Sequence, residues 1–398
     1  MSLEHMVTLN DITRRYGTEH ALVLLICRTF LGNADISEIN SFIQSNTINW
    51  DYFYHVVNRN SIRPVCYHVL SKANIPAHLH DKLQNDNKRI SIKSIEHLKE
   101  FLQVSNALKQ QDIQLIPYKG LALSATYYPN FHLREFSDVD FLIILKDEMD
   151  INKLSSFFKD KGYDPMYEVP ENFRSTFINY SCEYFFNKYE NGERKYHIDV
   201  HWLAHHPSFD LPEDLPNEVL FSDPATINIS GKEIQVLNTD NHLITLILHH
   251  GLRESWASLK YVLDIAMIVK NGTINWDYQR QMSTTYQYNR VLDTGIELID
   301  DLFGIKAGTG NNVSTDYYTN LILSGKPRRR SFFRKQARKI LLIDKPSGRL
   351  RVLLKTIKYS FYPSKLDYDM IKLPKSFFFL YIFVKIIRFG FTRKKEYQ

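Results

Sequence analysis

The spacing of apolar residues changes twice along this chain, and these changes constrain its fold more than any other feature. Over residues 10–111 apolar side chains recur at helical spacing with little Gly or Pro, which predicts an α-helical N-terminal part. Over 112–237 short β-rich runs alternate with helical segments and turn signals. The helical period returns over 240–303. This order predicts an α+β protein whose mixed sheet is flanked by helical N-terminal and C-terminal regions.

The elements of the central part can be placed individually. Asn191-Gly192 and Ser230-Gly231 each lie between β-rich runs and predict hairpins. Thr239 or Asp240 is expected to cap the helix that follows the second hairpin. The expected strands are residues 113–118, 136–145, 181–187 and 195–202, and the expected helices are 120–128, 150–160, 242–250 and 258–270. The parts expected from the whole pattern are residues 1–111, 112–238, 239–310 and 311–398.

The charge of the chain is distributed unevenly. Residues 321–398 carry 21 Lys/Arg and 4 Asp/Glu, whereas residues 1–320 carry 29 Lys/Arg and 40 Asp/Glu. A basic tail on an acidic body indicates an anionic partner, either a membrane surface or nucleic acid. The last apolar run, residues 376–391, is interrupted by Lys385 and Arg388 and is short for a spanning helix. It fits a helix at a membrane interface or a helix packed on the acidic body.

The cysteines and the N-terminus indicate the compartment. Cys27, Cys66 and Cys182 lie far apart, and none belongs to a CxxC pair. The first residues lack the basic flank and apolar run of a signal peptide. We therefore expect a cytoplasmic protein without disulfides, with peripheral contact at the inner membrane face if the basic tail binds lipid.

Two carboxylates occur in the segment Arg134-Glu-Phe-Ser-Asp-Val-Asp-Phe-Leu-Ile-Ile-Leu145. Asp138 and Asp140 are two residues apart on an expected strand, so both side chains point to the same face. A pair of carboxylates offers the hard oxygen ligands that Mg²⁺ prefers, with Mn²⁺ as a second candidate. Such a pair is common on surface strands, so its surroundings decide whether it is a site.

Those surroundings favour phosphate chemistry. Lys119 and Gly120 follow an expected strand and begin a helix, where the backbone can approach a phosphate closely and the helix N-terminus favours negative charge. The strand over 195–202 places His197, Asp199 and His201 on one face, which makes Asp199 a candidate third carboxylate. The histidines also invite a zinc interpretation, but HExxH and cysteine pairs are missing, so zinc is disfavoured.

The sequence resembles the polymerase-β-like nucleotidyltransferase superfamily and, more narrowly, an uncharacterised bacterial nucleotidyltransferase family with Lys-Gly in place of the usual Gly-Ser. The resemblance covers roughly residues 110–270. It is carried by Pro117-Tyr-Lys-Gly-Leu-Ala-Leu123, Arg134, Ser137-Asp-Val-Asp-Phe-Leu142, Asp199-Val-His-Trp202, His249-His250 and Tyr261-Val-Leu-Asp264. It implies a minimal nucleotidyltransferase core with helical additions, Mg²⁺ dependence and an unassigned acceptor, often associated with bacterial polysaccharide biosynthesis.

Carried over by position, the resemblance implies roles for individual residues. The metal ligands and catalytic carboxylates would be Asp138, Asp140 and Asp199. Lys119 and Gly120 would form the turn facing the phosphates, with the lysine as a point charge where the superfamily has a serine hydroxyl. Arg134 would contact phosphate or pair with an acid. Apart from the resemblance, the position of His197, His201 and Trp202 on or beside the strand of Asp199 predicts that they line or support the pocket.

The expected function is Mg-dependent transfer of a nucleoside monophosphate from a nucleoside triphosphate to an unidentified acceptor. A non-catalytic binding module with the same fold, at a membrane surface or on a partner protein, is the alternative. A transferase acting on nucleic acid ranks lower, because the sequence shows no RNA-binding module. An aminoglycoside-type enzyme of the same fold would need an acidic acceptor pocket. The acidic body of this chain is compatible with such a pocket, so this alternative stays open.

Overall fold

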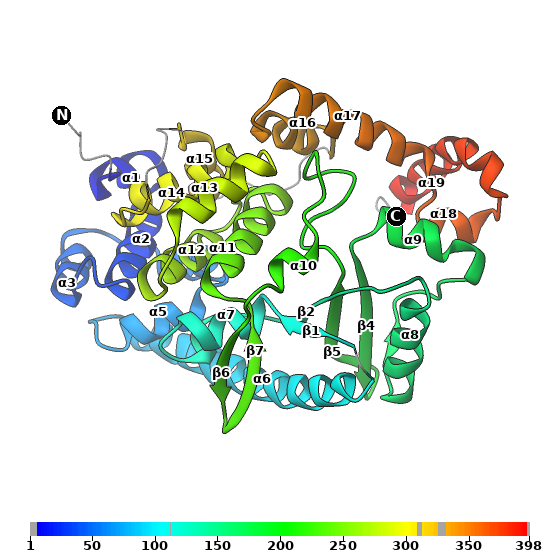
Figure 1. Ribbon diagram of the computed structural model, residues 1–398. Helices are drawn as coiled ribbons and strands as arrows, with labels where there is room; N and C mark the ends of the chain where they lie inside the picture. Colours follow the sequence, from blue (N-terminus) through cyan, green and yellow to red (C-terminus); the bar gives the residue numbers. More distant parts are fainter. Residues whose placement is uncertain (1–5, 112, 309–312, 325–331, 396–398) are drawn as a thin grey trace.

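The computed structural model describes residues 6–111, 113–308, 313–324 and 332–395. It confirms the expected α+β class, with a mixed five-stranded sheet, a separate two-stranded sheet and helical regions on both sides in the sequence (Figure 1). The N-terminal helices are α1 (Leu9–Tyr16), α2 (Thr18–Phe30), α3 (Ile36–Ser45), α4 (Trp50–Arg59), α5 (Arg63–Leu70) and α6 (Ala77–Lys109).

The large sheet has the strand order β1-β2-β5-β4-β3. Strands β2 and β5 pair in parallel at its centre, and the other pairs are antiparallel. The strands are β1 (Leu115–Pro117), β2 (Val139–Ile143), β3 (Asp164–Pro165), β4 (Glu183–Glu190) and β5 (Glu193–His201). Between them lie α7 (Gly120–Tyr127), η1 (Phe131–Leu133), α8 (Asp150–Asp160), η2 (Glu171–Phe173) and α9 (Arg174–Tyr180).

The two faces of this sheet differ in chemistry, because side chains alternate along each strand. Phe141 of β2, Phe186 of β4 and Val200 of β5 are buried in one apolar cluster with side chains of α6 and α8. Figure 1 shows the long helix α6 running beneath the sheet. The opposite face carries Asp140 and Asp199, and it is the face on which the site is built.

Both expected hairpins form as predicted. Asn191 and Gly192 have φ values of 52° and 80°, and Ser230 and Gly231 have 52° and 78°. Two successive positive φ values are those of a type I′ turn, which matches the twist of the flanking strands. The second hairpin is β6 (Ala225–Ile229) with β7 (Lys232–Val236), and it follows the short helix α10 (Asn217–Leu220).

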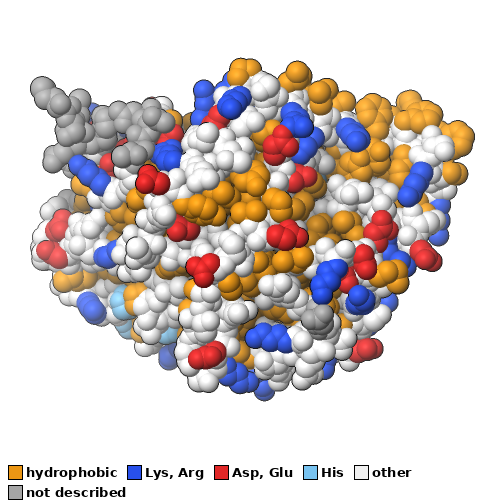
Figure 2. All heavy atoms as spheres, in the orientation of Figure 1, with side chains coloured by type: hydrophobic (Ala, Val, Ile, Leu, Met, Phe, Trp, Pro, Cys, Tyr) orange, Lys and Arg blue, Asp and Glu red, His pale blue; other side chains and the backbone are white. Residues whose placement is uncertain are grey.

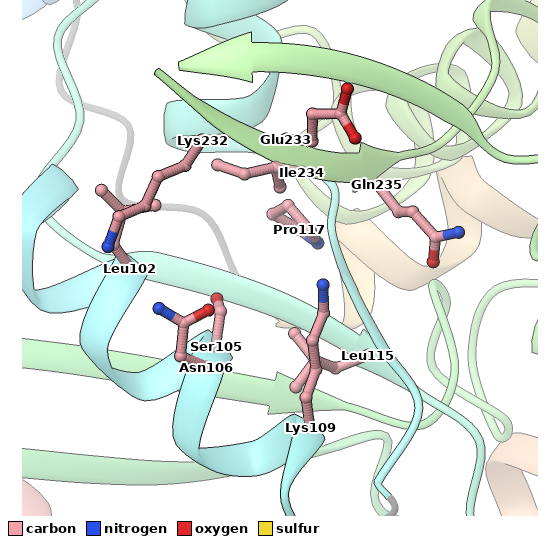
Figure 3. A pocket seen from close by; sticks show the side chains of 10 residues that line it. All are labelled: Leu102, Ser105, Asn106, Lys109, Leu115, Pro117, Lys232, Glu233, Ile234 and Gln235. Atoms are coloured by element: carbon pink, nitrogen blue, oxygen red, sulfur yellow. The ribbon is translucent and has the colours of Figure 1, made fainter. Parts of the chain in front are cut away.

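A small pocket lies where this hairpin meets α6 and β1 (Figure 3). Its volume is only about 30 Å³, and Lys109 reaches into it from α6 toward Pro117. None of the residues lining it is a predicted site residue, and it is too small for a nucleotide. The pocket marks a packing seam between the hairpin and α6.

The next helices return the chain to the N-terminal part. They are α11 (Thr239–Ile247), the π-helical η3 (Leu248–Arg253), α12 (Leu259–Asn271), α13 (Trp276–Thr285) and α14 (Asn289–Phe303). The expected cap at Thr239 or Asp240 was wrong, because Asn238 accepts the hydrogen bond from the Asn241 backbone N–H at 2.9 Å. Helices α11–α14 share one apolar core with α1–α5.

The C-terminal region packs on the body of the protein. It contains α15 (Asp316–Leu323), α16 (Phe332–Leu342), α17 (Pro346–Phe361), α18 (Lys365–Met370), η4 (Lys375–Leu380) and α19 (Tyr381–Lys395). Lys339 Nζ lies 2.6 Å from Asp210 Oδ1 and Lys355 Nζ lies 3.0 Å from Asp214 Oδ1. The acidic body therefore binds part of the basic tail. Within the described ranges, every helix is too short or too polar to cross a bilayer.

Candidate metal and phosphate site

Strand register brings two of the predicted carboxylates together. In the parallel pair β2–β5, Asp140 is the direct partner of Asp199. Asp138 immediately precedes β2 and lines the same cleft. Parallel pairing, which places equivalent residues of adjacent strands side by side on one face, is what joins residues so distant in sequence.

Lys119 and Gly120 lie against these carboxylates. Lys119 Nζ is 2.7 Å from Asp140 Oδ1, and the lysine side chain is largely buried. Gly120 begins α7 with φ +39°, and a Cβ on it would lie 3.4 Å from the Asp138 carbonyl oxygen and 3.8 Å from Asp140 Oδ2. The positive φ and the close approach both favour glycine here. The N-terminus of α7 thus lies beside the carboxylate pair.

His201 connects the carboxylates to a second ion pair. Its Nε2 lies 3.3 Å from Asp140 Oδ1, and its Nδ1 lies 3.1 Å from Glu183 Oε2. Arg253 of η3 binds both oxygens of Glu183, with Nη1 donating to Oε2 at 2.7 Å. A chain of polar contacts therefore runs from Asp140 across β5 and β4 to η3.

The other residues of this strand are placed differently. His197 Nε2 lies 2.7 Å from Asp199 Oδ1, while its Nδ1 lies 2.7 Å from Asn187 Oδ1. The hydrogen bond with Asp199 raises the pKa of His197 above its ordinary value, although burial opposes the rise. Trp202 is on the opposite side, where its indole packs against Phe177 and its Nε1 donates to the Ile178 and Ser181 carbonyls. Trp202 does not line the cleft.

Arg134 binds an acid. Its Nε and Nη2 donate to the two oxygens of Asp264 at 2.8 Å each, which is a bidentate pair. The Tyr128 hydroxyl donates to Asp264 Oδ1 at 2.8 Å, and His250 Nε2 lies 3.1 Å from Oδ2. Asp264 is fully buried, and this arrangement ties α12 to the segment that precedes β2. Arg134 also lines the cleft.

A cleft with a volume of about 320 Å³ opens over the carboxylates. Its walls come from the start of α7, the residues before β2, strand β5, η3 and α12. The residues lining it are Lys119, Gly120, Arg134, Phe136, Ser137, Asp138, Asp140, Asp199, His249, His250, Arg253, Glu254, Lys260 and Tyr261. The structure thus brings together every predicted catalytic and phosphate-facing residue.

The charges in the cleft interact strongly. Burial raises the pKa of Asp138, and the nearby negative charge of Asp140 raises it further. Burial is the largest single influence on the pKa values of Lys119 and Asp140 and disfavours both charged forms, but their mutual attraction together with the contacts of Tyr118 and His201 reverses it. The pKa of Lys119 therefore lies above its ordinary value and that of Asp140 well below. Burial, followed by the positive charge of Arg134, lowers the pKa of Lys260 to about 8.

The donor set fits a divalent cation. One ligand atom from each of Asp140, Asp199 and His201 lies within 4.8 Å of the others. Two carboxylates with one imidazole are compatible with a divalent metal ion. Asp138 lies outside this tight set, although it lines the cleft beside it. Lys119 Nζ binds Oδ1 of Asp140 in the structure, so a cation that binds this oxygen would compete with the ammonium.

Sequence reasoning missed Glu183, Arg253 and Lys260 as site residues. Glu183 lies at the start of an apolar strand, where a buried acid needs a partner, and this was the available signal. Arg253 follows His249-His250 by one helical turn, but nothing in the sequence relates it to Glu183. Lys260 enters the cleft because α12 packs beside α7.

Comparison with known families gives an independent result. A family model described as "Uncharacterised nucleotidyltransferase" matches residues 46–304, which is more than half of the chain. The matched range includes every residue that lines the cleft. No curated protein sequence matches the chain.

Proposed function

Since the chain belongs to the uncharacterised nucleotidyltransferase family, we propose that it moves a nucleoside monophosphate from a nucleoside triphosphate to an acceptor in the cleft over β2 and β5. We also propose the polymerase-β-like superfamily for its core. The arrangement that supports this proposal best is the convergence of Asp138, Asp140 and Asp199 with Lys119 and the N-terminus of α7.

In the proposed reaction, an acceptor oxygen forms a bond to the α-phosphorus of the nucleotide. The bond from this phosphorus to the bridging oxygen breaks, and pyrophosphate leaves with that electron pair. Asp199 would accept the proton of an acceptor hydroxyl, because its carboxylate lies directly across from Asp140. A bound Mg²⁺ would neutralise phosphate charge and help to position the acceptor oxygen and the bridging oxygen.

The side chains of the chain would do the remaining work. Asp138, Asp140 and Asp199 would hold the cation. Lys119 would turn from Asp140 to a phosphate once a cation neutralises that carboxylate. Arg253 and Lys260 would add positive charge at the η3 and α12 side of the cleft, where a triphosphate needs it.

The direct test is a screen of nucleoside triphosphates with Mg²⁺ or Mn²⁺, scoring self-modification and transfer to cell extract. Asp138→Ala and Asp140→Ala should each abolish transfer and cation-dependent nucleotide binding. Asp160→Asn on the exposed end of α8 is the matched control and should behave like the wild type. Full transfer by both cleft variants would refute the proposal.

A non-catalytic binding module is the second candidate, because Lys119 already neutralises Asp140 without a cation. Calorimetric titration separates the two functions. A transferase should bind nucleotide more tightly with Mg²⁺, whereas a module whose site has decayed should bind neither nucleotide nor Mg²⁺. We further propose that the protein acts in the cytoplasm and that its acceptor belongs to polysaccharide biosynthesis. If the acceptor were instead a nucleic acid, the protein should bind RNA or DNA with a steep dependence on salt.

A further inference from the structure

Exposed apolar side chains are concentrated at the C-terminal end of the molecule. Of the 21 large hydrophobic residues that are exposed in the described ranges, 14 lie within residues 341–387. Figure 2 shows apolar side chains gathered along the upper right of the molecule, where Figure 1 places α17–α19. Large contiguous apolar patches are uncommon on proteins without a partner, so this surface needs an explanation.

Helix α17 shows how the surface arises. Its exposed apolar residues recur at helical spacing and form one stripe: Leu350, Leu353, Leu354, Ile357 and Phe361. The opposite side packs on the body, with Thr356 Oγ1 donating to the Ser208 carbonyl at 3.1 Å and Tyr359 packing edge-on against Phe209. The helix therefore has a packed side and a second apolar side that faces outward.

The segment that follows extends this stripe. In η4 and α19, Phe378, Tyr381 and Val384 are buried inward, and their neighbours point outward. Phe383 is 59% exposed and Ile386 is 62% exposed. Both elements contact α17, so their outward side chains continue the same surface. We call the exposed apolar residues of α17, η4 and α19 the apolar face.

The charge around the apolar face is positive. Residues 341–388 include ten Lys/Arg and three Asp. Each of these aspartates is already bound: Asp344 by the Asn289 backbone N–H at 2.9 Å, Asp367 by Arg388 Nε at 2.7 Å, and Asp369 by Lys365. Asp367 and Asp369 are therefore neutralised by cations of the same region, whereas Asp344 keeps its charge and is held by amide N–H groups. The remaining cations favour an anionic partner.

A cleft of about 520 Å³ lies beside this face, between α9, α17 and η4. Lys358 and Lys375 line it, and within the described residues neither has a carboxylate partner, whereas the Asp214 carboxylate that also lines the cleft is paired with Lys355. By helical position Lys358 borders the apolar stripe of α17. Ser175 and Thr176 of α9 add hydroxyl groups to the lining. Cations and hydroxyl donors in one cleft are suited to a phosphate group.

We propose that the apolar face docks on an anionic phospholipid bilayer and that the Lys358–Lys375 cleft binds a lipid phosphate headgroup. The apolar side chains would enter the boundary between headgroups and acyl chains, while the two lysines remain at headgroup level. A second copy of the chain fits less well, because two such faces would bring like positive charges together. The proposal is independent of the nucleotidyl transfer reaction.

Vesicle sedimentation with the full chain tests the proposal. The two vesicle types are phosphatidylcholine alone and an equal mixture of phosphatidylcholine and phosphatidylglycerol. The wild type should bind the mixed vesicles more tightly than the neutral ones, and added salt should weaken this binding. Ile357→Ser with Phe383→Ser should weaken it at least about tenfold, since apolar groups leave the acyl boundary. Lys358→Gln and Lys375→Gln should each weaken it about fivefold.

Matched controls are Ile92→Ser and Lys99→Gln on α6. Both side chains are exposed, and α6 is not part of the apolar face. Both should bind like the wild type, and all variants should keep the wild-type melting temperature because the substituted groups are solvent-facing. Equal binding to neutral and mixed vesicles, or no binding, would overturn the proposal. The proposal would also be overturned if the wild type is a dimer that the Ile357→Ser, Phe383→Ser double variant converts to monomers. The same holds if the lysine variants lose the binding of inorganic phosphate but keep the binding of vesicles.

Discussion

At the scale of single residues, Lys119 has the most consequential position. Its ammonium binds Asp140 at 2.7 Å and so supplies, beside this carboxylate, the positive charge that a bound metal ion would supply. A lysine on a flexible stem can turn between two anionic groups, which a serine hydroxyl cannot do. Lys119 can therefore hold the carboxylates together before a nucleotide arrives and contact phosphate afterwards.

Lys119→Met should separate these two roles. We expect transfer to fall by about a hundredfold, because a charge that stabilises phosphate is removed. Affinity for Mn²⁺ without nucleotide should rise, since the ammonium no longer competes for Asp140. Calorimetric Mn²⁺ titration and transfer kinetics measure the two effects, with Lys99→Met as the control. Unchanged kinetics would contradict the phosphate role of Lys119.

Lys260 gives the cleft a pH dependence. Its folded-state pKa is about 8 and its ordinary value is 10.5, so burial in the folded protein disfavours its charged form. Between these values the unfolded chain binds more protons at this site, and stability therefore rises with pH across that window. Below about pH 8, burial of the charged Lys260 amine destabilises the folded wild type by its full amount, about 1 to 3 kcal/mol.

Lys260→Met should remove this contribution. The free energy of unfolding of wild type and variant, measured by urea titration, should differ most in favour of the variant at neutral pH. The difference should shift toward the wild type as pH rises from about 8 to 10.5. A difference that does not change across this window would contradict the depressed pKa of Lys260.

At the scale of elements, local patterns predicted much of the site. The alternation in Asp138-Val-Asp140 and the Asn191-Gly192 turn are short-range signals, so β2 and the β4–β5 hairpin could be placed from sequence. The same alternation places Trp202 on the face opposite His201. That parity was available from the sequence, and it shows why the indole packs in the core.

Long-range pairs could not be predicted in this way. Arg134 could contact phosphate or an acid on sequence grounds, and only the packing of α12 places Asp264 against it. Glu183 and Arg253 likewise meet because Arg253, in η3, reaches the start of β4. Such contacts depend on helix positions that one sequence does not specify. The same limit applies to the expected boundaries at residues 111, 238 and 310, which remain predictions.

The Arg134–Asp264 pair should be important for stability. Asp264→Ala leaves a buried guanidinium without its partner, and we expect a loss of about 3 to 5 kcal/mol in urea unfolding. The double variant Arg134→Met, Asp264→Leu removes both charges and should recover most of that loss. If the double variant is less stable than Asp264→Ala alone, the pair is not the source of the loss.

At the scale of the whole molecule, the central α/β part depends on its neighbours. Phe101 and Val104 of α6 belong to the apolar cluster beneath the sheet, and so do Tyr368 and Tyr381 of the C-terminal region. Helices α1–α5 share their core with α11–α14, whose α12 supplies Asp264. The site is therefore supported from segments that lie far outside residues 112–238.

A fragment of residues 112–238 should consequently fail to fold alone. Without α6 the apolar face of the sheet is exposed to water, and the burial that drives folding is lost. Far-ultraviolet circular dichroism during urea titration should show no cooperative transition, whereas the full chain should show one. A fragment as stable as the full chain would contradict this dependence.

The parallel register of β2 and β5 has a kinetic consequence. Asp140 and Asp199 meet through the strand pair with the widest sequence separation in the large sheet, whereas β4 and β5 are joined by a two-residue turn. Loop-closure entropy makes such distant pairings slow relative to hairpins. During refolding, the hairpin can therefore form long before the carboxylates meet. Regain of cation binding would then report when the centre of the sheet closes.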